Sequence, residues 1–431
     1  MLVPLACLAT FTKIGTLRAS SRLPETEAAA MDLKSGYPFW TVKNGLPGSF
    51  PPLLEDISCD VAVIGAGISG ALIAQSLADA GLDVAVLDKR DVGWGSTSAS
   101  TALLQYEIDT ELVALAASVG EPAAVAAYRA CEGAIPVLHE LAAQVGHSGF
   151  ARTKSLYLAS SQRHVQRLRG ECALRRRHGF AVTAVERAQL RSRFGLDAPV
   201  ALLTEVAAQV DPYRLTYSIL RNLRNRGVRV FDRTTVLGWQ AAPRGLRLSL
   251  ERDTAVRCRH LVVAAGYETQ QYLRRKVAVN HSSYALATEP VEGGLGPLRR
   301  LLLWESARPY LYLRSTPDHR IIVGGEDDTV DLPARRDTAV PRKAGVLMRK
   351  LAKLLPGKEL EASYAWAGTF AETRDGLPFF GPHEQHGPRV HFAMAYGGNG
   401  IVFSVIGAAI LRAQILRKAH PLKRLFSFER L

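Results

Sequence analysis

The residue pattern most able to do chemistry is a set of three glycines, Gly65, Gly67 and Gly70, spaced G-x-G-x-x-G directly after an apolar run at residues 61–64. The first glycine allows a tight strand-to-helix turn, the second lets backbone approach a pyrophosphate, and the third lets the helix pack close to the strand. An apolar, Ala-rich helical pattern follows, and the N-terminus of such a helix offers unpaired N–H groups and a positive dipole end to that anion. This pattern predicts a dinucleotide site.

A second apolar run, Val84–Leu87, ends in Asp88 and Lys89. A carboxylate at the tip of this strand accepts hydrogen bonds from a ribose hydroxyl. A lone G-x-G-x-x-G is weak evidence, but here strand, turn, helix, strand and acid follow one another in order. The chain holds one complete fingerprint, whereas chains that bind both FAD and NAD(P) usually show two. We therefore expect one bound dinucleotide.

Later motifs resemble those of the D-amino-acid-oxidase-like family of FAD-dependent oxidoreductases, which includes glycine oxidase, sarcosine oxidase and γ-glutamylputrescine oxidase. The resemblance covers about residues 59–413. After the first turn it rests on the sequences GWGSTSASTALL at 93–104, VDP at 210–212, AAG at 264–266, DGLP at 375–378 and GGNGI at 397–401. It implies an α/β fold, with a Rossmann-type FAD-binding domain and an inserted mixed-sheet α+β substrate domain.

The resemblance also implies which residues hold FAD without a covalent bond. Small hydroxyl side chains suit the phosphates and ribitol, and the late glycines let backbone N–H groups approach the flavin and stabilise negative charge on it. The expected set is Gly65, Gly67, Ile68, Ser69, Gly70, Asp88, Lys89, Ser96, Thr97, Thr101, Leu103, Leu104, Val236, Ala265, Gly266, Gly368, Gly397, Gly398, Asn399, Gly400 and Ile401.

In this family, hydride passes from a carbon that bears an amine to flavin N5, and the protein positions that carbon and excludes water. Tyr310 matches the family's substrate tyrosine, and alternation along the strand puts Tyr312 and Arg308 on the same face. Plain packing of these tyrosines on the sheet is the alternative. Gln105, just after the flavin loop, is a further candidate for substrate contact.

Phe370 departs from the family pattern. Amino-acid oxidases of this type hold the substrate carboxylate with an arginine there, and a phenylalanine offers no charge-assisted pair. The departure favours a small amine or a polyamine derivative over an amino acid, unless Arg308 or Arg314 supplies the missing group. Phe370 is therefore a candidate pocket residue, together with Tyr310, Tyr312, Arg308 and Gln105.

Two other activities stay open: FAD-dependent oxidation of a 2-hydroxy acid or of glycerol 3-phosphate, and a flavoprotein role in tRNA modification. The formal net charge of +14 among 431 residues motivates both. We expect no nucleic-acid partner, because no basic patch is interleaved with aromatic residues. The arginines at 163, 167, 169, 175, 176 and 177 are interpreted as a solvated helix face. The electron acceptor, O2 or a quinone or other carrier, and contact with a membrane surface stay open.

Five scattered cysteines without a C-x-x-C pair predict no disulfide framework and no metal site, and favour a cytoplasmic location. No run reaches the length of a membrane span, and residues 400–411 are interpreted as a buried helix. Residues 1–30 are either a targeting segment or an unstructured extension, and we favour the extension.

The predicted organisation alternates between two domains. We expect an N-terminal extension and arm at 1–55, packed by Tyr37, Phe39 and Trp40. The FAD-binding domain is expected at 56–150, 205–275 and 363–431, and the substrate domain at 151–204 and 276–362.

Overall fold

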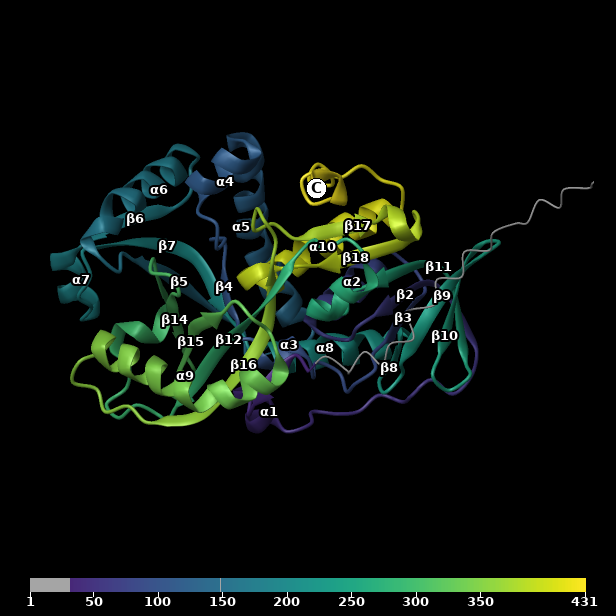
Figure 1. The fold of residues 1–431 in the computed structure, drawn as a ribbon, viewed down its shortest axis with the longest axis horizontal. Coiled ribbons are helices and arrows are strands. Elements are labelled where there is room, and N and C mark those ends of the chain that lie inside the picture. The colour runs from purple at the N-terminus through teal and green to yellow at the C-terminus, as the bar shows by residue number, and fades with distance from the viewer. Residues whose placement is uncertain (1–31, 148) are drawn as a thin grey trace, which may run out of the picture.

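The strands of this computed structural model, which describes residues 32–147 and 149–431, form two sheets. Figure 1 shows them in two lobes, with β2, β3 and β11 in one and β5, β7 and β15 in the other. The predicted α/β class is confirmed. The predicted extension at residues 1–30 lies outside the described residues.

The first sheet has eight strands in the order β17-β18-β11-β2-β3-β8, with β10 paired to β11 and β9 to β10. Its centre is parallel, because β2, β3, β8, β11 and β18 run in one direction. The middle of this sheet is apolar and buried, as in residues 61–64 of β2 and the whole of β3. The strands are β2 (Ile57–Ile64), β3 (Val84–Leu87), β8 (Arg229–Phe231), β9 (Val236–Ala242), β10 (Gly245–Leu250), β11 (Ala255–Val263), β17 (Phe379–Pro382) and β18 (Val390–Met394).

Helices α2 (Ile68–Ala78), α8 (Pro212–Asn225) and α10 (Gly400–Ile415) pack together on this sheet. Asp211 caps the start of α8, where its side chain accepts a hydrogen bond from the Arg214 N–H, and an Asp-Pro pair is a typical start signal of a helix. With the turn before it, α10 spans Gly397–Ile415, which is long and apolar enough to cross a membrane, contrary to the length expected from the sequence. Since 61% of that window is buried inside the protein, α10 has the character of a core helix, as predicted.

The second sheet has ten strands in the order β1-β16-β12-β15-β14-β13-β5-β7-β4, with β6 paired to β7. Most neighbours are antiparallel, and β5 and β13 are parallel. The strands are β1 (Lys34–Gly36), β4 (Leu103–Gln105), β5 (Ala151–Leu158), β6 (Val182–Glu186), β7 (Val200–Gln209), β12 (Val279–Thr288), β13 (Leu301–Glu305), β14 (Leu311–Ser315), β15 (Ile321–Asp328) and β16 (Ala362–Glu372).

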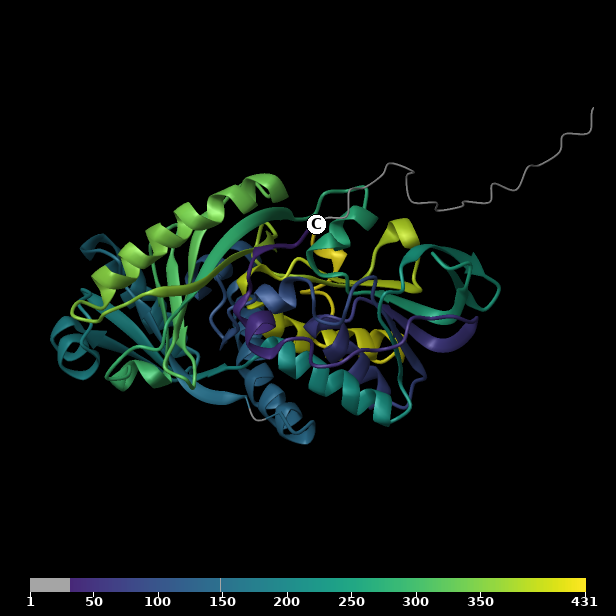
Figure 2. The same ribbon diagram turned by 90° about the horizontal axis from the view of Figure 1, so that it is seen from below.

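Helix α9 (Pro333–Leu354) lies along this sheet beside β12, β15 and β16, as Figure 2 shows from below. It begins at Pro333 and runs for 22 residues. Pro341 lies inside it, and a proline in a helical pattern is usually a stop signal. The remaining helices are α1 (Phe39–Asn44), α3 (Ser96–Ala99), α4 (Leu112–Val119), α5 (Glu121–Gln144), α6 (Val165–Arg177) and α7 (Arg187–Phe194).

Two interpretations of exposure are wrong. Arg175 of the arginine-rich helix α6 is fully buried, because its guanidinium pairs with Glu171 at 2.7 Å and with Glu107 at 3.5 Å. In the N-terminal arm, Phe39 and Trp40 are buried as predicted, but Tyr37 is 75% exposed. Tyr37 follows β1, on the edge of the sheet, so its ring points to solvent.

The proposed division into domains remains a proposal. Strands β4 and β16 lie within ranges assigned to the FAD-binding domain, yet both belong to the ten-stranded sheet. The chain therefore crosses between the sheets at residues 88–102, before β4, and at residues 373–378, after β16, and these crossings bring segments of both sheets to one cavity.

Candidate active site

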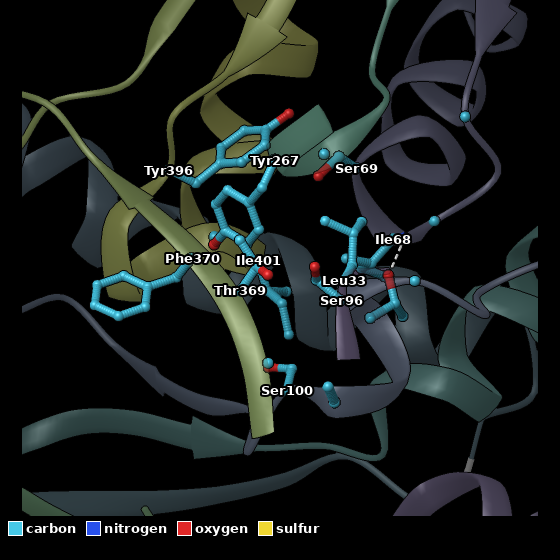
Figure 3. Close-up of a pocket in the computed structure, with 18 of the residues that line it drawn as sticks. Leu33, Ile68, Ser69, Ser96, Ser100, Tyr267, Thr369, Phe370, Tyr396 and Ile401 are labelled. Carbon is cyan, nitrogen blue, oxygen red and sulfur yellow. Dashed lines mark hydrogen bonds between the residues drawn. The ribbon is translucent and has the colours of Figure 1, made fainter. Parts of the chain in front are cut away.

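One long cavity runs between the two sheets. Its lining includes Asp88 and Glu268 beside the parallel sheet and Tyr310 and Phe370 on the antiparallel one. Its empty volume is about 1930 Å³, counting space open to solvent. Figure 3 shows Ile68 and Ser69 at one side of this cavity, Tyr267 and Tyr396 between, and Phe370 at the other side.

The glycine turn has the geometry that its spacing predicts. Gly65 has φ of 106°, in the region that favours glycine, and a Cβ there would lie 2.3 Å from the carbonyl oxygen of Ala264. A Cβ on Gly70 would lie 1.8 Å from the carbonyl oxygen of Gly65. Any side chain at Gly70 therefore pushes α2 away from β2.

Asp88 is held at the tip of β3 by the backbone. Its carboxylate accepts hydrogen bonds from the N–H groups of Ala66 at 2.7 Å and Arg90 at 2.8 Å. Burial raises the pKa of Asp88 to about 6, and these two N–H groups oppose the rise. Lys89 pairs with the buried Glu268 at 2.9 Å, and Arg90 pairs with the same carboxylate at 2.8 Å. This end of the cavity thus combines the Asp88 carboxylate, which suits a ribose, with two cations that share the carboxylate of Glu268.

The segment after β3 presents hydroxyl groups to the cavity. Thr97 accepts a hydrogen bond from the Ile68 N–H at 3.0 Å, the dashed line of Figure 3. The hydroxyl of Ser96 and the side-chain oxygen of Gln105 are buried and find no hydrogen-bond partner among residues 32–147 and 149–431, and both residues line the cavity. Buried polar atoms are rarely unpaired in proteins, so these two atoms are suited to form hydrogen bonds with a bound ligand. The glycine cradle and these orphaned atoms fit FAD.

The turn before α10 is fixed from two directions. Asp109 accepts the Gly398 N–H at 2.9 Å, and the Tyr267 hydroxyl donates to the Gly397 carbonyl at 3.0 Å. The Asn399 side chain donates to the Glu107 carbonyl at 2.6 Å. This turn is therefore held in place before any cofactor binds.

Tyr310 and Tyr312 line the cavity from the start of β14, as the sequence predicts. The Tyr310 hydroxyl donates to Asp109 at 3.0 Å, and the Tyr312 hydroxyl lies 3.3 Å from that of Ser283. Burial raises the pKa of both tyrosines well above the ordinary value. Both stay protonated at neutral pH, and Tyr310 acts as a hydrogen-bond donor to Asp109.

Neither of the two arginines considered as a carboxylate partner is free in the cavity. Arg314 is buried and donates to the carbonyls of Thr101, Ala102 and Val210. Arg308 is exposed, donates to the Asp109 carbonyl at 3.1 Å and lines a smaller hollow outside the main cavity. Phe370 lines the main cavity, with its ring 5.4 Å from that of His281.

Most of the predicted residues meet in this cavity. The exceptions are Arg308, Gly70, which is packed under the turn, and Leu104, which is buried in the core. The sequence reasoning missed Asp109, Glu268, Tyr267, Tyr396 and Asp327, all of which line the cavity. Four of them lie close in sequence to motifs that were quoted, so nearness to those motifs was the available signal.

The fold and cavity define a dinucleotide-dependent α/β oxidoreductase. The family model for FAD-dependent oxidoreductases matches residues 60–414, and the chain belongs to this family. The cofactor is accordingly FAD. None of the described cysteines lines the cavity.

Relatives agree with this assignment. The chain is 25% identical to a glycine oxidase of Bacillus licheniformis, over 84% of this chain and 94% of the relative. It is 24% identical to the γ-glutamylputrescine oxidoreductase of Escherichia coli, over 85% of this chain and 86% of the relative. The crystal structure of glycine oxidase from Geobacillus kaustophilus superposes with a TM-score of 0.71 at 21% identity, over 86% of this chain and 98% of that chain. The chain is an FAD-dependent oxidoreductase whose relatives act on amines or amino acids.

Proposed function

We propose that this protein oxidises a C–N bond of a small amine or polyamine derivative that carries no carboxylate on the reacting carbon. FAD, when bound, accepts the hydride at N5 and so supplies the oxidising power. The observation that carries the proposal is the charge of the cavity wall near Tyr310. Asp109 and Asp327 line it, whereas the lysine and arginine that line the cavity, Lys89 and Arg90, are paired with Glu268 at the other end.

Among the residues that the structure describes, no lysine or arginine lines the cavity near Tyr310, which argues against an anionic substrate. A carboxylate or phosphate beside Phe370 would lose water without gaining a charge-assisted partner. Arg314 is committed to backbone carbonyls and Arg308 lies outside the main lining. This disfavours both an α-amino acid and a 2-hydroxy acid or glycerol 3-phosphate.

The cofactor would be held by the residues that line the cavity. Gly65, Gly67 and the start of α2 suit the pyrophosphate, and Asp88 suits the ribose. Ser96, Thr97 and Thr101 suit the phosphates and ribitol, as the unpaired Ser96 hydroxyl supports. The remaining predicted residues keep the roles that the family resemblance implies.

The substrate would lie between Tyr310, Tyr312 and Phe370. The two hydroxyl groups would orient the nitrogen, and the aromatic rings would exclude water from the reacting carbon. Gln105 has an unpaired side-chain oxygen that could accept a hydrogen bond from an N–H of the amine.

The test is anaerobic reduction of the purified yellow holoenzyme by panels of primary amines, diamines, N-methyl amino acids, D-amino acids and 2-hydroxy acids. Loss of flavin absorbance with amines, and not with hydroxy acids, is the expected result. Reduction by 2-hydroxy acids alone would refute the proposal. Timing the return of absorbance in air and with a quinone identifies the acceptor, which this proposal leaves as O2 or a quinone or other carrier.

We also infer a cytoplasmic location, which four free, buried cysteines support. A tRNA substrate has less support, because many surface arginines are paired with acids, such as Arg187 with Asp197 at 2.6 Å.

A further inference from the structure

Asp327 reaches the cavity because of an irregularity in β15. Ser282 pairs with Asp328 and Tyr284 pairs with Gly325, so two residues of β15 stand opposite Ser283 alone. Such a bulge re-aims side chains, and it is common beside active sites. Glu326 has φ of 60°, in the left-handed region that a non-glycine residue rarely adopts.

The bulge changes which acid faces the ligand. Gly324 lies under the ring of Tyr312, and strict alternation from Gly324 would turn Glu326, not Asp327, to this face. Instead Asp327 lines the cavity. The strained backbone of Glu326 is thus part of the bulge that turns the Asp327 carboxylate into the cavity.

Within the described part of the chain, the neighbouring acids Glu326 and Asp328 form ion pairs with lysines, whereas Asp327 forms none. Lys343 of α9 donates to Asp328 at 2.7 Å, and Lys350 of α9 pairs with Glu326 at 2.5 Å. The Oδ1 atom of Asp327 is buried without a hydrogen-bond partner. A buried carboxylate without a cation is costly, so its place in the cavity calls for a ligand that supplies the charge.

The groups around Asp327 also favour a positively charged ligand group beside it. Burial raises its pKa to about 6, Asp109 and Glu372 raise it further, and Ser283 and His281 oppose the rise. The hydroxyls of Tyr310 and Tyr312 also face it, and both carry a pKa raised in part by its charge. Most of these neighbours are acidic or neutral.

We propose that Asp327 binds a second, permanently protonated nitrogen of the substrate, and that the preferred substrate is therefore a diamine or an amine with a remote ammonium group. This rests on the proposed function. The nitrogen that is oxidised must be neutral, and an ionised carboxylate beside it would favour its protonated form. A fixed carboxylate suits an ammonium that stays charged throughout, so one nitrogen anchors the molecule while the other reacts.

The experiment compares the FAD-loaded wild-type protein with two variants, Asp327→Asn and Glu372→Gln. The second variant removes a nearby rim acid as a matched control. The dissociation constants of 1,4-diaminobutane, butylamine and 4-aminobutanoate are measured from anaerobic perturbation of the flavin spectrum, and the reduction rates in the same titrations. FAD content and thermal unfolding are recorded for each variant.

The wild-type protein and Glu372→Gln should bind the diamine about 10- to 100-fold more tightly than butylamine, the effect of one charge-assisted hydrogen bond. Asp327→Asn should abolish this ratio and leave the affinity for butylamine nearly unchanged. An unchanged ratio in Asp327→Asn, or equal affinities in the wild-type protein, would overturn the inference.

Two features keep this test separate from that of the proposed function. If the amines bind with the expected ratio but never reduce the flavin, the proposed function fails and the inference about Asp327 stands. If they reduce it without any diamine preference, the inference alone fails. Should Asp327→Asn lose its FAD, the wild-type ratio at about pH 5 and about pH 8 decides, since it must shrink at the lower pH as Asp327 becomes protonated.

Discussion

The Tyr310 hydroxyl donates to the Asp109 carboxylate at 3.0 Å, and the other oxygen of Asp109 accepts the Gly398 N–H at 2.9 Å. One carboxylate thus joins the substrate sheet to the turn that leads into α10. The proposed substrate tyrosine and the proposed flavin turn are positioned by a single residue.

Replacing the Asp109 carboxylate should weaken the positioning of both Tyr310 and the turn at Gly398. Asp109→Ala removes two hydrogen bonds, so we expect a loss of about 1–3 kcal/mol in unfolding free energy and weaker retention of FAD. Tyr310→Phe keeps the bond to Gly398 and should retain FAD while the rate of flavin reduction falls. Gel filtration followed by flavin absorbance checks both. Equal FAD loss in the two variants would contradict the assignment of the Gly398 contact as the cofactor-side bond.

Gly70 should tolerate no side chain. A Cβ there would lie 1.8 Å from the Gly65 carbonyl oxygen, so Gly70→Ala should destroy FAD binding and lower stability by at least about 1–3 kcal/mol. Gly133→Ala is the matched control, because Gly133 lies exposed in α5 with nothing within 4 Å of its Cβ position. That variant should gain about 0.5–1 kcal/mol. Thermal unfolding with and without added FAD measures both, and a Gly70→Ala protein that binds FAD normally would refute the close-packing account.

Phe370 should determine whether the enzyme prefers cationic or anionic substrates. Phe370→Arg places a cation in a cavity that now lacks one at this end, so the rate constant kcat/KM for diamines should fall about tenfold or more. Values for amines that carry a carboxylate should fall less or rise. Phe370→Leu keeps the wall apolar and should change the ratio of the two much less. The account fails if the arginine leaves the ratio unchanged.

The pKa of Asp327 is raised from 3.8 to about 6, so its charge is present above about pH 6 and lost below it. Since a cationic substrate needs the ionised form, kcat/KM for 1,4-diaminobutane should rise as the pH rises through about 6. The folded protein holds this proton more tightly than the unfolded chain, so ionisation of Asp327 lowers stability as the pH rises from 3.8 to about 6. Asp327→Asn should therefore raise the unfolding temperature at about pH 8 more than at about pH 5, while diamine binding weakens. Parallel losses of stability and binding would indicate a structural role instead.

The sequence was informative where local rules decide the structure. The turn at Gly65–Gly70, the helix start at Asp211 and the tyrosines of β14 follow from spacing, capping and alternation, and all lie where those rules predict. Asp327 could not be found in the same way, because the bulge at Glu326 breaks the alternation that a strand pattern assumes. Arg175 was misjudged for a related reason, since its buried partner Glu107 is supplied by the tertiary fold, which also buries Glu171 one turn earlier on the same helix.

Anaerobic titration of the purified holoenzyme with 1,4-diaminobutane tests the central claim most directly. The account predicts FAD in the purified protein and complete loss of its oxidised absorbance with the diamine, and no loss with a 2-hydroxy acid of similar size. A protein that releases no FAD on denaturation, or a flavin reduced by the hydroxy acid and not by amines, would contradict it.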